Sequence, residues 1–218
     1  GQASIGGVCG SSEGSILSSY NAGSVEGTQS PAFVGGVCGY NANGGSIFNS
    51  YNTGSVTGGD NLSVGGVCGY NSRSSSISNS YNTGSVTGAG ASAGGVCGSI
   101  SGGSISNSYN VGSVTGTGDN VGGVCGINSD GKISNSYNAG LVTGTGEGAH
   151  VGGVCGSLSL FFQIEDCFYL AGTAKEGVGD EDEDQTGDGT ETGVESVTLD
   201  NFANKVKSWK TETYSDVW

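Results

Sequence analysis

One sequence unit repeats along most of the chain, and this feature constrains the fold more than any other. The sequence VGGVCGYNANGGSIFNSYNTGSVTG begins at residue 34, and close copies begin at residues 64, 93 and 121. Looser copies begin at residues 5 and 151, so the interval from one start to the next is nearly constant. A fixed period of this size is typical of solenoids, in which each repeat forms one turn and stacks on its neighbours.

Three segments of each repeat predict β-strands: GGVCG, S-I-x-N-S-Y-N and G-S-V-T-G. Each is rich in β-branched or aromatic residues and is bounded by Gly, Asn or Ser. None has a helical period long enough to compete with the strand pattern. We therefore predict an all-β fold, a parallel β-helix (β-solenoid) of about six turns with three strands per turn. Right-handed coiling is expected from the usual hand of parallel crossovers.

Stacking in register would place equivalent residues in columns. The isoleucine column is 16, 47, 77, 105, 133 and 164; the valine column is 25, 56, 86, 114 and 142; the tyrosine column is 20, 51, 81, 109 and 137, with Phe168 in the sixth turn. We expect these columns to fill the interior or its corners. An asparagine column, 21, 52, 82, 110 and 138, is expected to hydrogen-bond along the stack at a spacing of about 4.8 Å.

The last copy and the tail predict a cap. Leu199, Phe202, Val206 and Trp209 lie at helical spacing after Thr198, which predicts a short helix that covers the last turn. We predict a solenoid over 1–178, an acidic Gly-rich loop over 179–195 and a C-terminal cap with a short helix over 196–218. The N-terminal end shows no equivalent cap and the chain has no Met, so we expect a monomer that is part of a longer chain.

The charge distribution excludes some partners. The formal net charge is −14, and residues 151–218 hold 14 of the 20 acidic residues. Nucleic acids and anionic membrane surfaces both need clustered basic residues, which this chain lacks. We therefore expect no nucleic-acid binding, and no apolar run is long enough to predict membrane insertion by this chain.

Six of the seven cysteines fall in one column of the predicted stack. They are Cys9, Cys38, Cys68, Cys97, Cys125 and Cys155, and Cys167 is additional. We interpret the column as buried thiols that act as small apolar side chains, with disulfides between turns as the alternative. A metal site is disfavoured because no C-x-x-C pair or His cluster accompanies the cysteines.

No catalytic constellation is evident in the sequence. His150 is the single histidine, and we interpret it as a solvated loop residue rather than as part of a Ser-His-Asp triad or a His-rich metal centre. The acids of the repeats lie scattered in the linkers and do not form a column, unlike the paired carboxylates of glycoside hydrolases. We predict a protein without enzymatic activity.

An acidic stretch after the last repeat suggests a metal site. Asp180, Asp182, Asp184, Asp188 and Glu191 fall at positions 1, 3, 5, 9 and 12 of a calcium-binding loop. Gln185 occupies position 6, where that motif needs Gly, and helical flanks are not evident. Two interpretations stay open: a calcium site, which would be the one cofactor of the chain, or a solvated acidic spacer.

The repeat G-G-V-C-G followed by S-I-S-N-S-Y-N-T-G-S-V-T-G resembles the GLUG-motif repeat of bacterial surface proteins over about residues 3–175. Val-Cys stands here where Leu-Val is common in that family. The resemblance implies a non-catalytic extracellular module at the bacterial cell surface, of adhesin or display type, with a host glycan or a host or bacterial surface protein as partner. Similar repeats flank the catalytic part of some immunoglobulin-A-cleaving metallopeptidases. A stalk or substrate-positioning module of such a secreted enzyme is therefore the alternative, although the zinc motif H-E-x-x-H is absent from this sequence.

Overall fold

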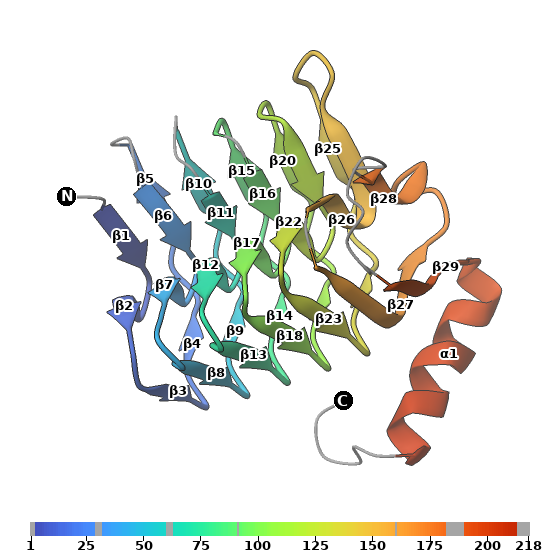
Figure 1. The fold of residues 1–218 in the computed structure, drawn as a ribbon, viewed down its shortest axis with the longest axis horizontal. Coiled ribbons are helices and arrows are strands. Elements are labelled where there is room, and N and C mark those ends of the chain that lie inside the picture. The colour runs from blue at the N-terminus through green and yellow to red at the C-terminus, as the bar shows by residue number, and fades with distance from the viewer. Residues whose placement is uncertain are drawn as a thin grey trace.

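The computed structural model shows a parallel β-solenoid of about six turns with one C-terminal helix (Figure 1). It describes residues 3–28, 32–59, 63–90, 92–159, 161–181 and 190–212, and of residues 181, 190–192 and 209–212 it describes the backbone alone. The all-β solenoid predicted from the repeat is confirmed. Among the described residues, no helix is both long and apolar enough to cross a membrane.

Each of the first five turns contains five short strands. The first turn holds β1 (Ala3–Gly6), β2 (Cys9–Ser12), β3 (Ser15–Leu17), β4 (Tyr20–Asn21) and β5 (Val25–Gly27). The second holds β6 (Ala32–Gly35), β7 (Cys38–Asn41), β8 (Ser46–Phe48), β9 (Tyr51–Asn52) and β10 (Val56–Gly58). The third holds β11 (Ser63–Gly65), β12 (Cys68–Ser72), β13 (Ser76–Ser78), β14 (Tyr81–Asn82) and β15 (Val86–Gly88).

The next turns continue this order until the two long strands of the sixth turn. The fourth turn holds β16 (Ser92–Gly94), β17 (Cys97–Ser101), β18 (Ser104–Ser106), β19 (Tyr109–Asn110) and β20 (Val114–Gly116). The fifth holds β21 (Asn120–Gly122), β22 (Cys125–Ser129), β23 (Lys132–Ser134), β24 (Tyr137–Asn138) and β25 (Val142–Gly144). The sixth holds β26 (His150–Ser159) and β27 (Gln163–Leu170), and β28 (Glu176–Glu181), β29 (Thr190–Val197) and α1 (Leu199–Glu212) follow.

Three parallel sheets run along the solenoid. Sheet A joins the first two strands of every turn, sheet B joins the third and fourth strands, and sheet C contains β5, β10, β15, β20 and β25. Equivalent residues pair from turn to turn, as Val56 pairs with Val86 in sheet C. This in-register stacking is what the near-constant repeat period predicts.

The GGVCG segment bends between two strands and is not one strand as predicted. Gly65 ends β11, and a Cβ atom on it would lie 1.9 Å from the carbonyl oxygen of Cys68. A Cβ on Gly66 would lie 2.1 Å from the carbonyl oxygen of Gly95 in the next turn. Only glycine fits both positions. The Gly-Gly pair therefore sets the sharp bend between the first and second strands of each turn, both of which belong to sheet A.

The S-I-x-N-S-Y-N segment is also divided into two strands. Asn49, Asn79, Asn107 and Asn135 have φ angles of 52°, 50°, 49° and 47°, in the left-handed region. Asparagine adopts this conformation more readily than most residues, and it breaks the strand between the isoleucine and the tyrosine. Each of the first five turns therefore has five strands, not three, although these strands form three sheets.

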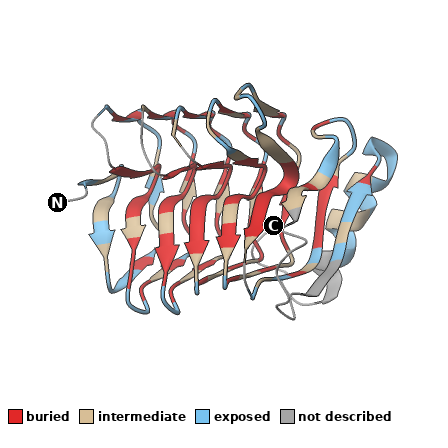
Figure 2. Cartoon of the chain, turned by 45° about the horizontal axis from the view of Figure 1, so that its top comes forward, coloured by how far each residue is buried: buried red, intermediate tan, exposed pale blue. Residues whose placement is uncertain are grey.

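The core consists of the predicted apolar columns, which Figure 2 shows as buried bands along the solenoid. The isoleucine and valine columns are buried throughout, and the six-cysteine column is buried from Cys38 to Cys155. All seven cysteines are free, so the interpretation as buried thiols is confirmed. A second group of valines, Val37, Val67, Val96, Val124 and Val154, completes the same core.

The tyrosine column differs from the prediction because it lies on the outer surface of sheet B. Successive rings stack with centroids 4.8 to 5.2 Å apart and planes within 10° of parallel. Tyr20 at the first turn is 61% exposed, whereas Tyr137 is 6% exposed because helix α1 covers it. The rings stabilise the stack by contact with one another rather than by filling the interior.

Two asparagine ladders follow the interior corners. In the predicted ladder each Nδ2 donates to a backbone carbonyl two residues on, and each except that of Asn138 also donates to the Oδ1 of the next turn, as Asn52 donates to Asn82 at 2.8 Å. A second ladder, Asn41, Asn71 and Asn128, is interrupted by Ser12 and Ile100. These interruptions explain why the buried Oδ1 atoms of Asn41 and Asn128 have no hydrogen-bond partner, since the preceding turn supplies no amide.

The C-terminal cap contains two strands as well as the predicted helix. β28 pairs with β26 and β29 pairs with β27, both in parallel. The prediction of a loop over 179–195 is therefore wrong at both ends, because residues 179–181 and 190–195 extend sheets A and B by backbone pairing. Helix α1 follows, with Phe202 edge-on to Tyr137 and Phe168 at centroid distances of 5.3 Å.

Candidate binding cleft at the last turn

Sheet C ends one turn before the other two sheets. In the described part of the chain β25 is its last strand, whereas sheets A and B continue through β28 and β29. The cause lies in the sequence. In the fifth turn the chain completes β25 and a corner between Val142 and Gly152. In the next turn the equivalent positions are Ala174 and Glu176, and Lys175 alone separates them. The chain therefore reaches β28 without forming another strand of sheet C or the corner that follows it.

Only the first position of the missing strand is present. In each turn of sheet C the valine N–H donates to the residue before the next valine, as Val114 donates to Leu141 at 2.9 Å. Val142 makes the same bond to the carbonyl of Thr173 at 2.9 Å. Ala174 then contacts the valine column, and the chain turns towards β28. The segment 172–176 thus starts a sixth strand and leaves it unfinished.

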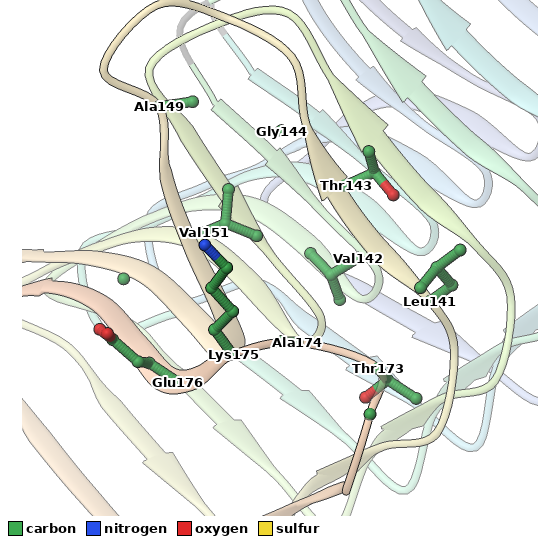
Figure 3. Close-up of a pocket in the computed structure, with 12 residues that line it drawn as sticks. Leu141, Val142, Thr143, Gly144, Ala149, Val151, Thr173, Ala174, Lys175 and Glu176 are labelled. Atoms are coloured by element: carbon green, nitrogen blue, oxygen red, sulfur yellow. The ribbon is translucent and has the colours of Figure 1, made fainter.

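A cleft of about 630 Å³ opens where β25 and segment 172–176 diverge (Figure 3). Its apolar surface comes from Leu141, Val142, Ala149, Val151 and Ala174. Its polar groups come from Thr143, Thr173, Lys175 and Glu176. This volume lies within the range of about 300 to 1,000 Å³ that is usual for ligand sites.

Two residues at the cleft depart from the repeat. Leu141 occupies the position of Ser24, Ser55, Ser85 and Ser113, and its side chain is 58% exposed. Lys175 directly precedes Glu176, and Figure 3 shows its side chain extending towards Val151. Among the described side chains, no carboxylate lies within ion-pair distance of the Lys175 ammonium group. The cleft thus combines an apolar surface with the cation of Lys175 and the carboxylate of Glu176.

The proposed calcium ligands are only partly described by the structure. Asp180 lies in β28, and its Oδ2 is 3.6 Å from His150 Nδ1, with both side chains partly exposed. Asp182, Asp184 and Asp188 lie outside the described residues, and for Glu191 only the backbone is described. The calcium site stays a prediction. Within the described residues, no group of three or more His, Cys, Asp or Glu side chains is arranged to hold a metal ion.

Sequence reasoning did not predict the cleft, although its signal is present in the sequence. The signal is a shortened repeat, AGTAKEGVGD in place of AGLVTGTGEGAHVGG, together with Leu141 and Lys175 at positions that are otherwise small or apolar. A deletion in one turn of a solenoid removes a length of wall and exposes the interior beside it.

The GLUG motif family matches residues 34–57 and 60–87. The chain carries GLUG-motif repeats. The matched residues belong to the second and third turns, and the same sequence pattern continues in the turns on both sides. Among curated proteins, none matches this chain significantly.

Among solved structures, a candidate immunoglobulin A1 protease from Bacteroides ovatus has a similar fold. The TM-score is 0.58 and the sequence identity is 19%, and the alignment covers 87% of this chain and 69% of that chain. At this identity the similarity extends to the fold alone.

Four of the seven cysteines have a raised pKa in this fold. Each column thiol lies within hydrogen-bond distance of the carbonyl two residues on, as Cys68 Sγ lies 3.3 Å from the carbonyl of Tyr70. Burial raises the pKa of Cys68 and Cys125 well above the usual range, and burial raises the pKa of Cys167 to about 12. For Cys38, a hydrogen bond with Cys68 and then burial raise the pKa. Protonated thiols are poor nucleophiles and poor metal ligands, so these side chains serve packing.

Three tyrosines of the stacked column are similarly held in the neutral form. Burial, and then the neighbouring tyrosine, raise the pKa of Tyr109 to about 12. The same two causes raise the pKa of Tyr81 and Tyr137. The repeat columns therefore present packed, neutral groups over five turns, and the cleft at the end of sheet C is where the repeat pattern changes.

Proposed function

We propose that this chain is a non-catalytic GLUG-repeat module of an extracellular bacterial surface protein, which displays or spaces a binding region. The observation that carries the proposal is the repetition of the same buried columns through every turn. Interior isoleucine, valine, cysteine and asparagine columns make a rigid rod, because each side chain contacts its equivalents in the turns before and after it. Such a rod suits spacing and display.

The chemistry of the described side chains supports a non-catalytic role. Burial raises the pKa of the Cys68, Cys125 and Cys167 thiols, and His150 lies beside Asp180 on the partly exposed surface. Incubation of the protein with immunoglobulin A1 and with a panel of polysaccharides is expected to leave all of them intact. Cleavage of any of them by the purified protein would contradict the proposal.

The adhesive part of the proposal concerns partners. We expect the monomeric protein to bind a host glycan or a host or bacterial surface protein, and not nucleic acid. The test is a binding screen with the immobilised protein against glycans and surface proteins, with calcium and with a chelator. Binding that needs calcium would assign the acidic segment that begins at Asp180 a role in recognition. Absence of binding across the screen would reject adhesion and leave spacing as the function.

The alternative is a stalk or substrate-positioning module of a secreted enzyme whose catalytic domain lies elsewhere. The observation that favours it is the fold similarity to a candidate immunoglobulin A1 protease. In that case, removal of the GLUG repeats from the longer protein is expected to change the KM for its substrate more than kcat. Unchanged kinetics after removal would reject the alternative.

A further inference from the structure

The open edge of sheet C is defined by a series of backbone carbonyls. Gly27, Gly58, Gly88 and Gly116 end successive strands of the sheet. Each of their carbonyls accepts an N–H from the following turn, at 2.9, 3.0, 2.9 and 2.9 Å respectively. Gly144 is the next member of the series, and no described residue donates to its carbonyl. The cleft therefore contains a strand edge that is ready to accept backbone hydrogen bonds.

The burial of these glycines also distinguishes Gly144 from the others. Gly58, Gly88 and Gly116 are buried by the turn that follows each of them, whereas Gly144 is only half-buried. The space beside Gly144 is bordered by Val142 and Val151, which belong to the apolar core of the solenoid. An apolar side chain from an added strand would continue the packing that joins every earlier pair of turns.

We propose that this cleft binds an extended peptide segment of a partner protein, added in parallel as a further strand of sheet C. The peptide places an apolar side chain in the space beside Gly144 that Val142 and Val151 border, and a carboxylate beside Lys175. Its backbone N–H donates to the carbonyl of Gly144. Strand addition of this kind derives affinity from main-chain hydrogen bonds and specificity from the side-chain slots. The inference goes beyond the proposed function, because it assigns a binding site and a partner chemistry that the display role of the rod does not require.

Two features favour an acidic peptide over a sugar. No aromatic side chain lines the cleft among the described residues, so a sugar ring has no stacking surface there. Lys175 is exposed and in no described ion pair, and its side chain extends towards Val151, whereas the carboxylate of Glu176 extends away from Val151 (Figure 3). A carboxylate on the peptide would pair with this cation at the rim of the cleft.

The test is titration of the ¹⁵N-labelled protein with the peptide acetyl-Ala-Val-Gly-Asp-Thr-amide, followed by NMR. Amide shifts are expected to be confined to residues 141–151 and 172–179. The same peptide with every backbone nitrogen methylated, which removes the donors, is expected to bind at least about 10-fold more weakly. Replacement of its Asp by Asn is expected to weaken binding by about 3- to 10-fold.

A matched pair of protein variants tests the role of the cation. Lys175→Glu is expected to weaken binding by about 10-fold, and Lys207→Glu, an equal charge reversal at an exposed position of α1, is expected to leave it unchanged. Equal binding of the methylated peptide, shifts outside the two ranges, or no binding at all would overturn the proposal. Binding of an acidic oligosaccharide at this cleft in place of the peptide would also overturn it.

Discussion

Replacement of Asn82 by alanine tests whether the asparagine ladder stabilises the stack. Asn82 is fully buried, and its Nδ2 donates to the carbonyl of Gly84 at 2.7 Å and to Asn110 Oδ1 at 2.8 Å. Its Oδ1 accepts from Asn52 Nδ2 at 2.8 Å. The variant removes all three bonds, in the middle of the solenoid and away from water.

The size of the expected loss of stability depends on which hydrogen-bond partners of Asn82 keep another bond in the variant. Asn52 Nδ2 still donates to the carbonyl of Gly54, and Asn110 Oδ1 still accepts from the N–H of Gly112. The buried carbonyl of Gly84 loses this bond outright. One orphaned group costs about 1–3 kcal/mol and each of the two weakened bonds about 0.5–1.5 kcal/mol, so the free energy of unfolding is expected to fall by about 2–6 kcal/mol.

Urea unfolding followed by circular dichroism measures this loss, with two control variants. Asn21→Ala removes the half-buried first member of the same column, where water can replace the lost bonds, and is expected to cost about 1 kcal/mol. Thr83→Ala changes an exposed side chain next to Asn82 and is expected to cost less than about 0.5 kcal/mol. Equal losses for Asn82→Ala and Asn21→Ala would refute the reasoning, because burial would then have no effect.

Three further predictions concern other parts of the stack. Ile100→Ala is expected to lower the free energy of unfolding by about 2–5 kcal/mol. Ile100→Asn is expected to lower it less, because the new amide can donate to the Oδ1 of Asn128, which has no partner. Urea unfolding compares the two variants. The contribution of Cys167 to the free energy of unfolding is expected to be fully present below about pH 9 and to be lost as the pH rises from 9 towards 12, by up to about 1.4 kcal/mol per pH unit. The reason is that burial raises the pKa of Cys167 from 9.0 to about 12, so the unfolded chain loses the thiol proton first; a flat profile would contradict this. Phe202→Ala is expected to speed amide hydrogen exchange in helix α1 while leaving exchange in β12 unchanged, since Phe202 packs on Tyr137 and Phe168 at the cap alone.

The regular part of the fold was predictable because stacking gives a residue type the same neighbours in every turn. A residue at one position of the repeat meets its own equivalent in the turns before and after it, as Ile77 pairs with Ile47 and Ile105. The apolar columns and the first asparagine ladder follow from the period without knowledge of the cross-section. The outward position of the tyrosines did not follow, because an aromatic ring in a strand fits either face and its burial depends on the bend before it.

The bends and the cap were less predictable for physical reasons. Composition suggested strands across GGVCG, but the close approach of Gly66 to the carbonyl of Gly95 is a property of neighbouring turns, not of the segment itself. Likewise, EGVGDE at β28 is Gly-rich and acidic, which is typical of a loop, yet it pairs with β26 along its length. The existing edge of sheet A supplies hydrogen bonds that outweigh the weak strand propensity of this segment.

A regular solenoid offers the same surface at every turn, so a specific site requires a departure from the repeat. Three departures coincide at the end of sheet C: the missing corner between Ala174 and Glu176, the exposed Leu141 in place of serine, and the cation of Lys175 beside Val151. None of them is expected to add stability. The missing corner leaves an open strand edge and an unfilled apolar space, the leucine is exposed, and Lys175 has no described ion-pair partner. A purely structural end turn would be expected to close this gap, as the preceding turns do. Their coincidence at one cleft therefore supports recognition there, with the preceding turns as its rigid support.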